Sequence, residues 1–131
     1  MLAKITIADY MAKHIVTLKK ETDVLTAIKQ LLSHKITSAP VLDENGHLLG
    51  IFSEKDCMKV ALETVYNEGP IANVAEYMAT DTVTVNADAS VIDLAEKFKN
   101  SSTRSYPVYD DRELVGMISR ADVLRALVTI L

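Results

Sequence analysis

Apolar positions recur with helical spacing in two stretches of the chain, and the two stretches resemble each other. The first predicts an amphipathic helix, capped by Thr22 or Asp23, from the apolar residues Val24, Leu25, Ile28, Leu31 and Leu32. The second predicts a matching helix from the apolar residues Val91, Ile92, Ala95 and Phe98. The same element is therefore predicted twice.

A β-hairpin and a further helix are predicted after each of these helices. Residues 40–52 contain two apolar runs around an Asn45-Gly46 turn signal, and residues 107–118 contain a similar pair with a turn one residue shorter. The helix after the first hairpin begins near Ser53 and runs towards Tyr66, and its counterpart carries Val123, Leu124, Leu127 and Val128. At the start of the first copy, the sequence predicts a short helix with Ile7, Ala8, Tyr10 and Met11, followed by an extended segment over 15–18.

The whole order of elements is duplicated. Tyr10-Met11-Ala12 returns 67 positions later as Tyr77-Met78-Ala79, and after the shorter turn the offset becomes 66. We therefore predict an α+β fold of two tandem β-α-β-β-α repeats, 1–66 and 67–131 with a linker at 67–70. The repeats would be related by a pseudo-two-fold axis within one compact module. At about 65 residues each repeat would be marginal alone, so we expect the halves to share a core.

Composition excludes several classes of function. The net charge of −4 and the lack of a Lys/Arg cluster argue against a nucleic-acid partner. No apolar run approaches 18 residues and no signal peptide is recognised, so neither membrane insertion nor secretion is expected. The single cysteine, Cys57, suits a reducing compartment, and a cytoplasmic location is the expectation.

Catalytic and metal chemistry find little support in the sequence. His14, His34 and His47 fall in three different predicted elements without metal-ligand spacing, and Cys57 has no partner His nearby. No P-loop, nucleophile elbow or dinucleotide motif occurs. We therefore expect neither a metal site nor an enzyme, and no required cofactor.

The ordered set of motifs resembles a known family, the CBS domain (cystathionine-β-synthase-type repeat). Tyr-Met, Val-Thr, a helix, Ser-x-Pro-Val, a hairpin and Gly-x-x-Ser-x-x-Asp occur twice, so the chain is similar to a tandem CBS pair, or Bateman module. The resemblance implies a regulatory module that binds an adenosine-containing ligand, such as AMP, ADP, ATP or S-adenosylmethionine, in clefts between the repeats. It also implies a free-standing CBS pair, since no other domain is recognised in the sequence.

The Gly-x-x-Ser-x-x-Asp motif would carry the ligand chemistry, and it also has a purely structural interpretation. A strand leads into a helix N-terminus there, whose free N–H groups and partial positive charge suit an anion. By the resemblance, Ser would bond a phosphate, Asp would accept from ribose hydroxyls and Gly would let the ligand approach. The alternative is a capping box, in which Ser and the acid satisfy each other's N–H groups. Asp instead of Glu or Gln, and a Gly within a strand, favour the ligand. The residues concerned are Gly50, Ser53 and Asp56 in the first copy and Gly116, Ser119 and Asp122 in the second.

The resemblance adds further candidate ligand residues. Thr17 and Thr84 would line an adenine pocket, and an apolar wall beside the base would come from Ala39, Pro40, Tyr106 and Pro107. A phosphate on an acidic protein needs a local cation, which Arg104 and Arg120 offer in the second copy. The first copy has Thr37 and Glu54 at those positions. An ordinary strand or surface role is the alternative for each of these residues.

The last helix of each repeat carries more apolar residues than one buried face of a helix can hold. This predicts a homodimer through their outward faces, with Leu124 and Leu127 as the first candidates for contact residues. Together these features predict a sensor of an adenosine-containing ligand that relays its state to an unidentified protein partner. The alternative is a ligand-free structural or oligomerisation module that docks on another protein.

Overall fold

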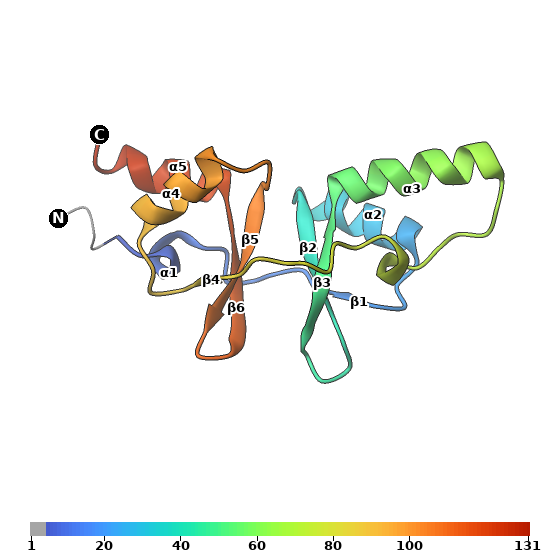
Figure 1. The fold of residues 1–131 in the computed structure, drawn as a ribbon, viewed down its shortest axis with the longest axis horizontal. Coiled ribbons are helices and arrows are strands. Elements are labelled where there is room, and N and C mark those ends of the chain that lie inside the picture. The colour runs from blue at the N-terminus through green and yellow to red at the C-terminus, as the bar shows by residue number, and fades with distance from the viewer. Residues whose placement is uncertain (1–4) are drawn as a thin grey trace. The chain divides into compact units, whose positions relative to one another are not determined.

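The computed structural model describes residues 5–131, and the chain divides into two compact units. Unit 1 contains residues 5–15 and 83–131, and unit 2 contains residues 16–82. Each unit holds one three-stranded sheet with helices packed on it (Figure 1). The tandem α+β repeat architecture predicted from the sequence is confirmed.

Unit 2 is built from the middle of the chain. Its sheet has the order β1 (Leu18–Lys19), β2 (Ser38–Leu42) and β3 (Leu48–Ser53), with β1 parallel and β3 antiparallel to β2. Its helices are α2 (Val24–His34), α3 (Glu54–Asn67) and the 3-10 turn η2 (Val74–Glu76). Asp23 is the N-cap of α2 and accepts a hydrogen bond from the Thr26 N–H at 2.8 Å, as one of the two predicted caps.

Unit 1 repeats this plan with segments from both ends of the chain. Its sheet has the order β4 (Val85–Asn86), β5 (Ser105–Asp110) and β6 (Glu113–Ser119), again with one parallel and one antiparallel pair. Its helices are α4 (Val91–Lys99), α5 (Arg120–Val128) and the short α1 (Ile7–Tyr10). Figure 1 shows α1, coloured blue, in the same unit as the red α5.

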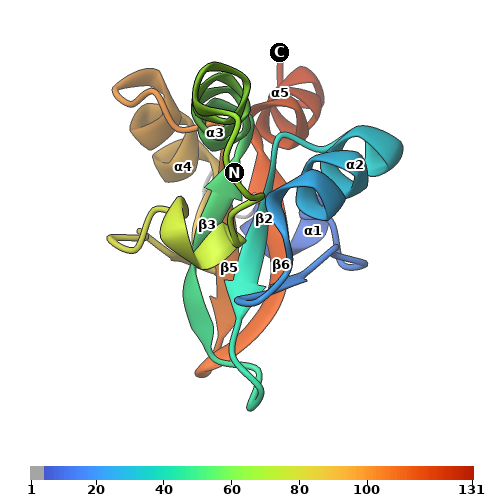
Figure 2. The same ribbon diagram turned by 90° about the vertical axis from the view of Figure 1, so that its right-hand side faces the viewer.

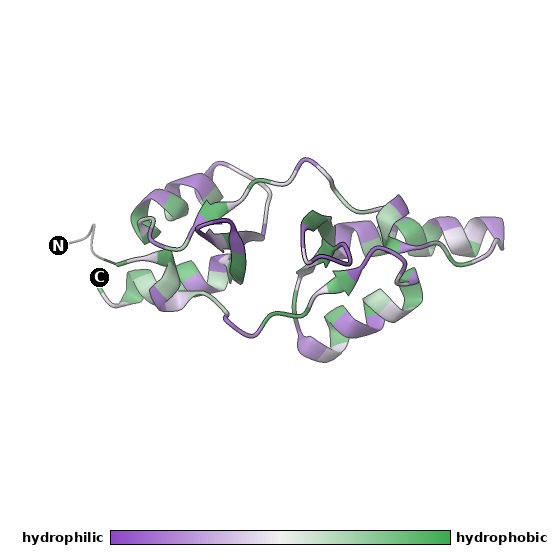
Figure 3. Cartoon of the chain, turned by 90° about the horizontal axis from the view of Figure 1, so that it is seen from below, coloured by the Kyte–Doolittle hydropathy of each residue, from purple (hydrophilic) through white to green (hydrophobic). Residues whose placement is uncertain are grey.

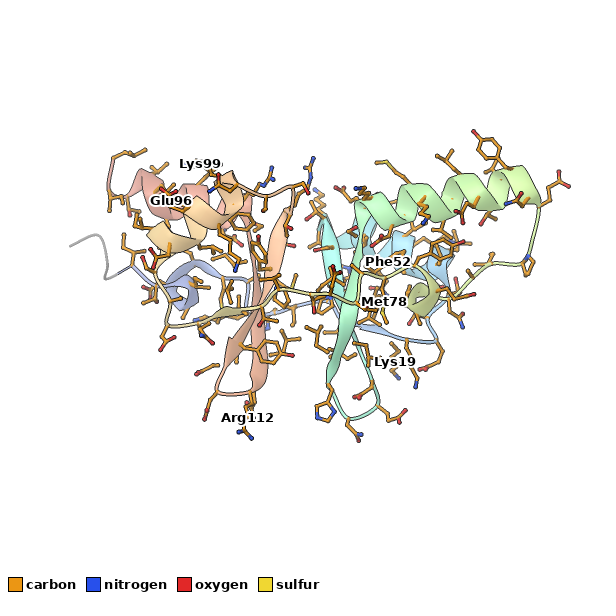
Figure 4. The ribbon with its side chains drawn as sticks, viewed as in Figure 1. Lys19, Phe52, Met78, Glu96, Lys99 and Arg112 are labelled. Atoms are coloured by element: carbon orange, nitrogen blue, oxygen red, sulfur yellow. The ribbon has the colours of Figure 1, made fainter. Side chains whose placement is uncertain are left out.

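Each hydrophobic core combines residues from both sequence repeats. In unit 1, Ile7 of α1 is buried with Val91, Val108 and Ile118. In unit 2, Val74 of η2 is buried with a cluster that includes Phe52, and Met78 lies close to Phe52 against this cluster (Figure 4). The expected sharing of a core therefore takes the form of an exchange, in which each repeat donates its short N-terminal helix to the other core. The repeat boundary at 66/67 stays a prediction about the sequence.

The two hairpins differ in their turns, as the sequence predicted. Asp111 and Arg112 connect β5 to β6, and both have positive φ, which is the backbone of a type I′ turn. The turn between β2 and β3 is longer, and its Asp43 Oδ1 accepts from the N–H groups of Asn45 and His47 at 2.8 and 2.9 Å. Figure 2 shows both hairpins projecting away from the helices.

The first strand of each repeat is shorter and later than predicted. The extended segment was expected over 15–18, but β1 begins at Leu18 and β4 at Val85. Each strand pairs through only two residues with the middle strand, so the preceding residues form no ladder.

Within residues 5–131, no helix is long and apolar enough to cross a membrane.

Candidate functional site

The candidate residues of unit 1 gather at one end of its sheet. Because β4 runs parallel to β5 and β6 runs antiparallel, the starts of β4 and β5 and the end of β6 lie at the same end. Thr84 immediately precedes β4, Arg104 immediately precedes β5, and Ser119 ends β6 opposite Ser105. The structure therefore brings together residues that are up to 35 positions apart in the sequence.

Unit 2 arranges its own candidates in the same way. Thr17 immediately precedes β1, Thr37 immediately precedes β2, and Ser53 ends β3 opposite Ser38. Thr17 and Thr84 were expected within a strand; instead both are exposed and lie just before a two-residue strand. They remain candidates at the sheet end, without a ladder to hold them.

Ser119 and Asp122 form a complete capping box at the start of α5. The Asp122 N–H donates to Ser119 Oγ at 3.2 Å, and the Ser119 N–H donates to Asp122 Oδ2 at 2.8 Å. In unit 2, the Ser53 N–H donates to Asp56 Oδ2 at 2.9 Å, and the Asp56 N–H approaches Ser53 Oγ at 3.4 Å. The structural interpretation of the motif is thus realised in both copies.

These contacts correct two arguments made from the sequence. Asp was taken as a poor closing residue for a capping box, yet its shorter side chain reaches the N-cap N–H in both units. The helix N-termini were also expected to offer free N–H groups. In fact the Arg120 N–H donates to the Arg104 carbonyl at 3.1 Å, and the Glu54 N–H donates to the Thr37 carbonyl at 2.9 Å. Fewer backbone donors are left for an anion than predicted.

Packing also accounts for the two glycines of the motif. A Cβ on Gly116 would lie 2.5 Å from the Ala12 carbonyl oxygen, and a Cβ on Gly50 would lie 2.5 Å from the Ala79 carbonyl oxygen. The Tyr-Met-Ala segment hydrogen-bonds at these places: Ala12 bridges to Met117, and Ala79 bridges to Ile51. Close approach of backbone to backbone therefore requires glycine here, with or without a ligand.

The two aspartates differ in their surroundings. Asp122 is buried, with 8% of its surface exposed. Its Oδ1 forms an ion pair with Nη2 of Arg125, one helical turn further along α5. Asp56 is half-buried, and within residues 5–131 its carboxylate accepts hydrogen bonds only from the N–H and the hydroxyl of Ser53. Sequence reasoning missed Arg125, although the i, i+3 spacing to Asp122 was visible.

The two arginines of unit 1 have different roles in the structure. Arg120 donates from Nε to the Thr103 carbonyl at 3.1 Å and from Nη2 to the Ser101 carbonyl at 3.0 Å. Its side chain therefore fastens the loop between α4 and β5. The exposed Arg104 side chain forms no hydrogen bond or ion pair with any other residue in the described part of the chain. Of the two cations predicted for a phosphate, Arg104 is the unengaged one.

The predicted apolar wall consists of buried residues. Ala39 and Tyr106 belong to the cores of their units, and Pro40 and Pro107 are almost completely buried. The Tyr106 ring packs on Phe98 with centroids 4.9 Å apart, and its hydroxyl lies 3.1 Å from Ser101 Oγ. These contacts give Tyr106 a core role.

Cys57 has the environment of a packed thiol. Partial burial, together with the nearby charges of Asp56 and Glu54, raises the pKa of Cys57 to about 11. The thiolate is therefore strongly disfavoured at neutral pH, as expected for a cysteine without a nucleophilic role. Among the residues that the structure describes, no group of three or more His, Cys, Asp or Glu side chains could hold a metal ion.

Solved structures with the same fold include CBS domain pairs. The chain superposes with a TM-score of 0.84 at 26% identity on the CBS domain pair of protein MJ0100, in complex with 5′-methylthioadenosine and S-adenosyl-L-methionine, covering 97% of this chain and 98% of that one. It matches the CBSX2 protein in complex with AMP with a TM-score of 0.82 at 27% identity, covering 95% and 97% of the two chains. CBSX2 is a CBS-pair protein from Arabidopsis thaliana.

Curated relatives include both short and long proteins. A CBS domain-containing protein of Dictyostelium discoideum is 27% identical over 98% of this chain and 94% of its own length. An uncharacterized protein of Methanocaldococcus jannaschii is 23% identical over 92% of this chain, which spans only 42% of that relative. A homoserine O-acetyltransferase of Methanococcoides burtonii is 28% identical, and the chain spans 25% of its length.

The CBS domain family matches the chain twice, over residues 7–63 and 74–129. These ranges contain both capping-box motifs and both three-stranded sheets. The resemblance read from the sequence is therefore confirmed, and the chain belongs to the CBS domain family as a tandem pair.

Proposed function

We propose that this protein is a regulatory module that binds an adenosine-containing ligand at the sheet ends carrying Ser119 and Asp122 in unit 1 and Ser53 and Asp56 in unit 2. The observation that carries the proposal is the placement of a serine hydroxyl and an aspartate carboxylate at one helix N-terminus in both units. A hydroxyl can donate to a phosphate oxygen, and a carboxylate can accept from a ribose diol. One nucleotide offers both partners.

Ligands of related structures support this choice of chemistry. The ligands named with the CBS pairs of MJ0100 and CBSX2 are 5′-methylthioadenosine, S-adenosyl-L-methionine and AMP. The adenosine moiety is common to all three, while the phosphate occurs in AMP alone. Adenosine recognition is accordingly the core of the proposal, and AMP, ADP, ATP or S-adenosylmethionine are the specific candidates.

A second candidate function needs no ligand. The capping boxes satisfy the Ser-x-x-Asp motifs internally, and the glycines are explained by backbone packing. Under this alternative, the pair is a structural module that docks on another protein. Exposed apolar side chains would provide the contact, and they include Met58 and Leu62 on α3 and Leu124 and Val128 on α5.

The proposed relay uses these same helix faces. Apolar and polar residues alternate along α3 (Figure 3), and Met58, Leu62, Val65 and Tyr66 are 53 to 76% exposed. These positions fall on one side of a helix at i, i+4, i+7 and i+8. We infer that such faces meet a second copy of the chain, and that ligand binding alters contacts with that copy or with a partner protein.

Isothermal titration decides between the two candidate functions. The purified chain is titrated with adenosine, AMP, ADP, ATP and S-adenosylmethionine, and sodium phosphate and GMP serve as controls for charge and base. Saturable binding of at least one adenosine compound, with a ligand-dependent rise in the thermal midpoint, supports the sensor. Absence of saturable binding for the whole panel overturns it and leaves the structural module. Chromatography of the incubated ligands tests for turnover, which is not expected.

A further inference from the structure

One of the differences between the two candidate sites lies outside the shared motif, at residue 125 of α5. Arg125 of α5 corresponds to Lys59 of α3 at the offset of 66 that relates Ser119 to Ser53. Arg125 Nη2 is paired with Asp122 Oδ1, whereas Lys59 forms no ion pair with Asp56 among the contacts of residues 5–131. The Arg125 side chain is 62% exposed, while the Asp122 side chain is 12% exposed.

The two serine hydroxyls also differ, because within the described part of its own unit the Ser53 hydroxyl donates a hydrogen bond and the Ser119 hydroxyl does not. Ser53 Oγ donates to Asp56 Oδ2 at 3.0 Å, so its proton is already used within the capping box. Ser119 Oγ accepts from the Asp122 N–H and donates to no acceptor in the described part of the chain. Unit 1 therefore offers a hydroxyl donor but has both carboxylate oxygens engaged. Unit 2 has its hydroxyl engaged but leaves Asp56 Oδ1 unpaired within the described residues.

We propose that Arg125 is a specificity-determining residue that makes unit 1 select phosphorylated over uncharged nucleosides. Unit 2 lacks this selectivity, because Asp56 can bind the ribose of a phosphorylated or an uncharged nucleoside. The proposal rests on the adenosine-ligand function proposed above. A ribose diol binds a carboxylate best with one hydroxyl on each oxygen, so at Asp122 it competes with the Arg125 guanidinium for Oδ1. An uncharged nucleoside has no anionic group that could replace Asp122 Oδ1 as the partner of the Arg125 guanidinium.

A phosphate changes this competition at unit 1. The phosphate oxygens can accept a hydrogen bond from the Ser119 hydroxyl. The exposed Arg125 side chain can exchange the Asp122 carboxylate for the phosphate, because the carboxylate and the phosphate are both anions. The arginine then retains a charge-assisted partner when the ribose takes Oδ1. At Asp56 no cation has to be displaced, so removal of the phosphate should cost less there.

The test is a nuclear magnetic resonance titration in which each site is followed by its own amides. Adenosine and AMP are added to the unmodified protein, to Arg125→Gln and to Lys59→Arg, and the amides of 119–122 and 53–56 report the two sites. Arg125→Gln should strengthen adenosine binding at 119–122 about two- to fivefold, the range for a solvent-exposed ion pair. AMP should gain less or be weakened. Lys59→Arg should weaken adenosine at 53–56.

Arg112→Gln is the matched control, because it removes the same charge at the exposed turn between β5 and β6, the sheet end opposite Ser119 (Figure 4). It should leave adenosine affinity at both sites unchanged. If Arg125→Gln perturbs the spectrum beyond α5, Arg125→Lys, which copies unit 2, replaces it. Saturable binding with equal adenosine affinity at 119–122 in the unmodified protein and the Arg125 variant overturns the role of Arg125 alone. No saturable shift at 119–122 with adenosine or AMP in any variant also overturns the role of Arg125, and the proposed function falls with it only if ADP, ATP and S-adenosylmethionine fail to bind as well.

Discussion

Gly116 lies so close to Ala12 that a Cβ at position 116 would come within 2.5 Å of the Ala12 carbonyl oxygen. The same segment is held by reciprocal hydrogen bonds between Ala12 and Met117, at 2.8 and 3.1 Å. Residue 12 belongs to the first sequence repeat and residue 116 to the second. This contact therefore fastens the exchanged α1 segment to the sheet of unit 1, as Gly50 and Ala79 do in unit 2.

Alanine at either glycine should destabilise the fold. Gly116→Ala and Gly50→Ala each force a methyl group against backbone, which the strand pairing prevents from moving, so a loss of about 1–3 kcal/mol in the free energy of unfolding is expected. Urea denaturation followed by circular dichroism measures it. Gly69→Ala is the matched control, since nothing lies within 4 Å of a Cβ there. An equal stability of Gly116→Ala and the control would contradict the packing role.

Much of the fold was predictable because the same order of elements is encoded twice in the sequence. The capping of α2 by Asp23, the helix beginning after Ser53 and the shorter second turn followed from local patterns. The exchange of short helices was not predictable, because Ile7 and Val74 carry the same apolar signal whichever core they enter. Only the tertiary pairing of the Tyr-Met-Ala segments decides that.

The residues of the candidate site could be named from the sequence, but their hydrogen-bond partners could not. Ser119 and Asp122 were found from the motif, whereas their mutual capping was the alternative that the choice of Asp was thought to disfavour. The engagement of Arg120 with two loop carbonyls depends on the path of residues 101–103, which has no sequence signature. Side-chain competition of this kind becomes visible only with coordinates.

The apolar faces of α3 and α5 should hold two chains together. Leu124 and Val128 are 62 and 68% exposed on one side of α5, whereas Leu127, chosen from the sequence as an outward residue, packs against the core. Sedimentation velocity at tens of micromolar should give a dimer for the unmodified chain and a monomer for Leu124→Glu or Leu62→Glu. Leu127→Glu is expected to unfold the protein instead. A monomeric unmodified chain would rule out the dimer.

The cap of α2 should make stability depend on acid pH. Hydrogen bonds from the Thr26 N–H and hydroxyl lower the pKa of Asp23 from its usual value, 3.8. Since the folded pKa lies below the unfolded one, the unfolded chain binds more protons in that window. The stabilisation is therefore complete above about pH 5 and is lost as pH falls through the folded pKa. Thermal melts from pH 3 to 7 should fall less steeply at the acid end for Asp23→Asn. Parallel curves for the two proteins would contradict this assignment.

Cys57 should react slowly with thiol reagents. With a pKa of about 11, about one thiol in a thousand is ionised at pH 8, compared with roughly a quarter for an ordinary cysteine. Labelling with iodoacetamide, followed by mass spectrometry, should be at least tenfold slower than for glutathione and should accelerate with pH up to about 11. The same measurement in urea should restore the ordinary rate. Labelling of the native protein as fast as glutathione would contradict the raised pKa.

Substitutions of Arg104 and Arg120 should have different effects, one on phosphate binding and the other on the structure of the loop before β5. Arg104 is exposed and unengaged among the described residues, so Arg104→Gln should weaken AMP about fivefold or less, the limit for an exposed charge pair, and leave adenosine unchanged. Arg120→Gln removes the same charge but frees the carbonyls of Ser101 and Thr103. Its main effect should be faster amide hydrogen exchange in residues 100–105, with affinity lost equally for AMP and adenosine. Calorimetry with both ligands, alongside exchange measured by mass spectrometry, distinguishes the two arginines. If Arg120→Gln alone lost AMP selectively, the phosphate cation would be Arg120, and the loop contacts seen here would have to open on binding.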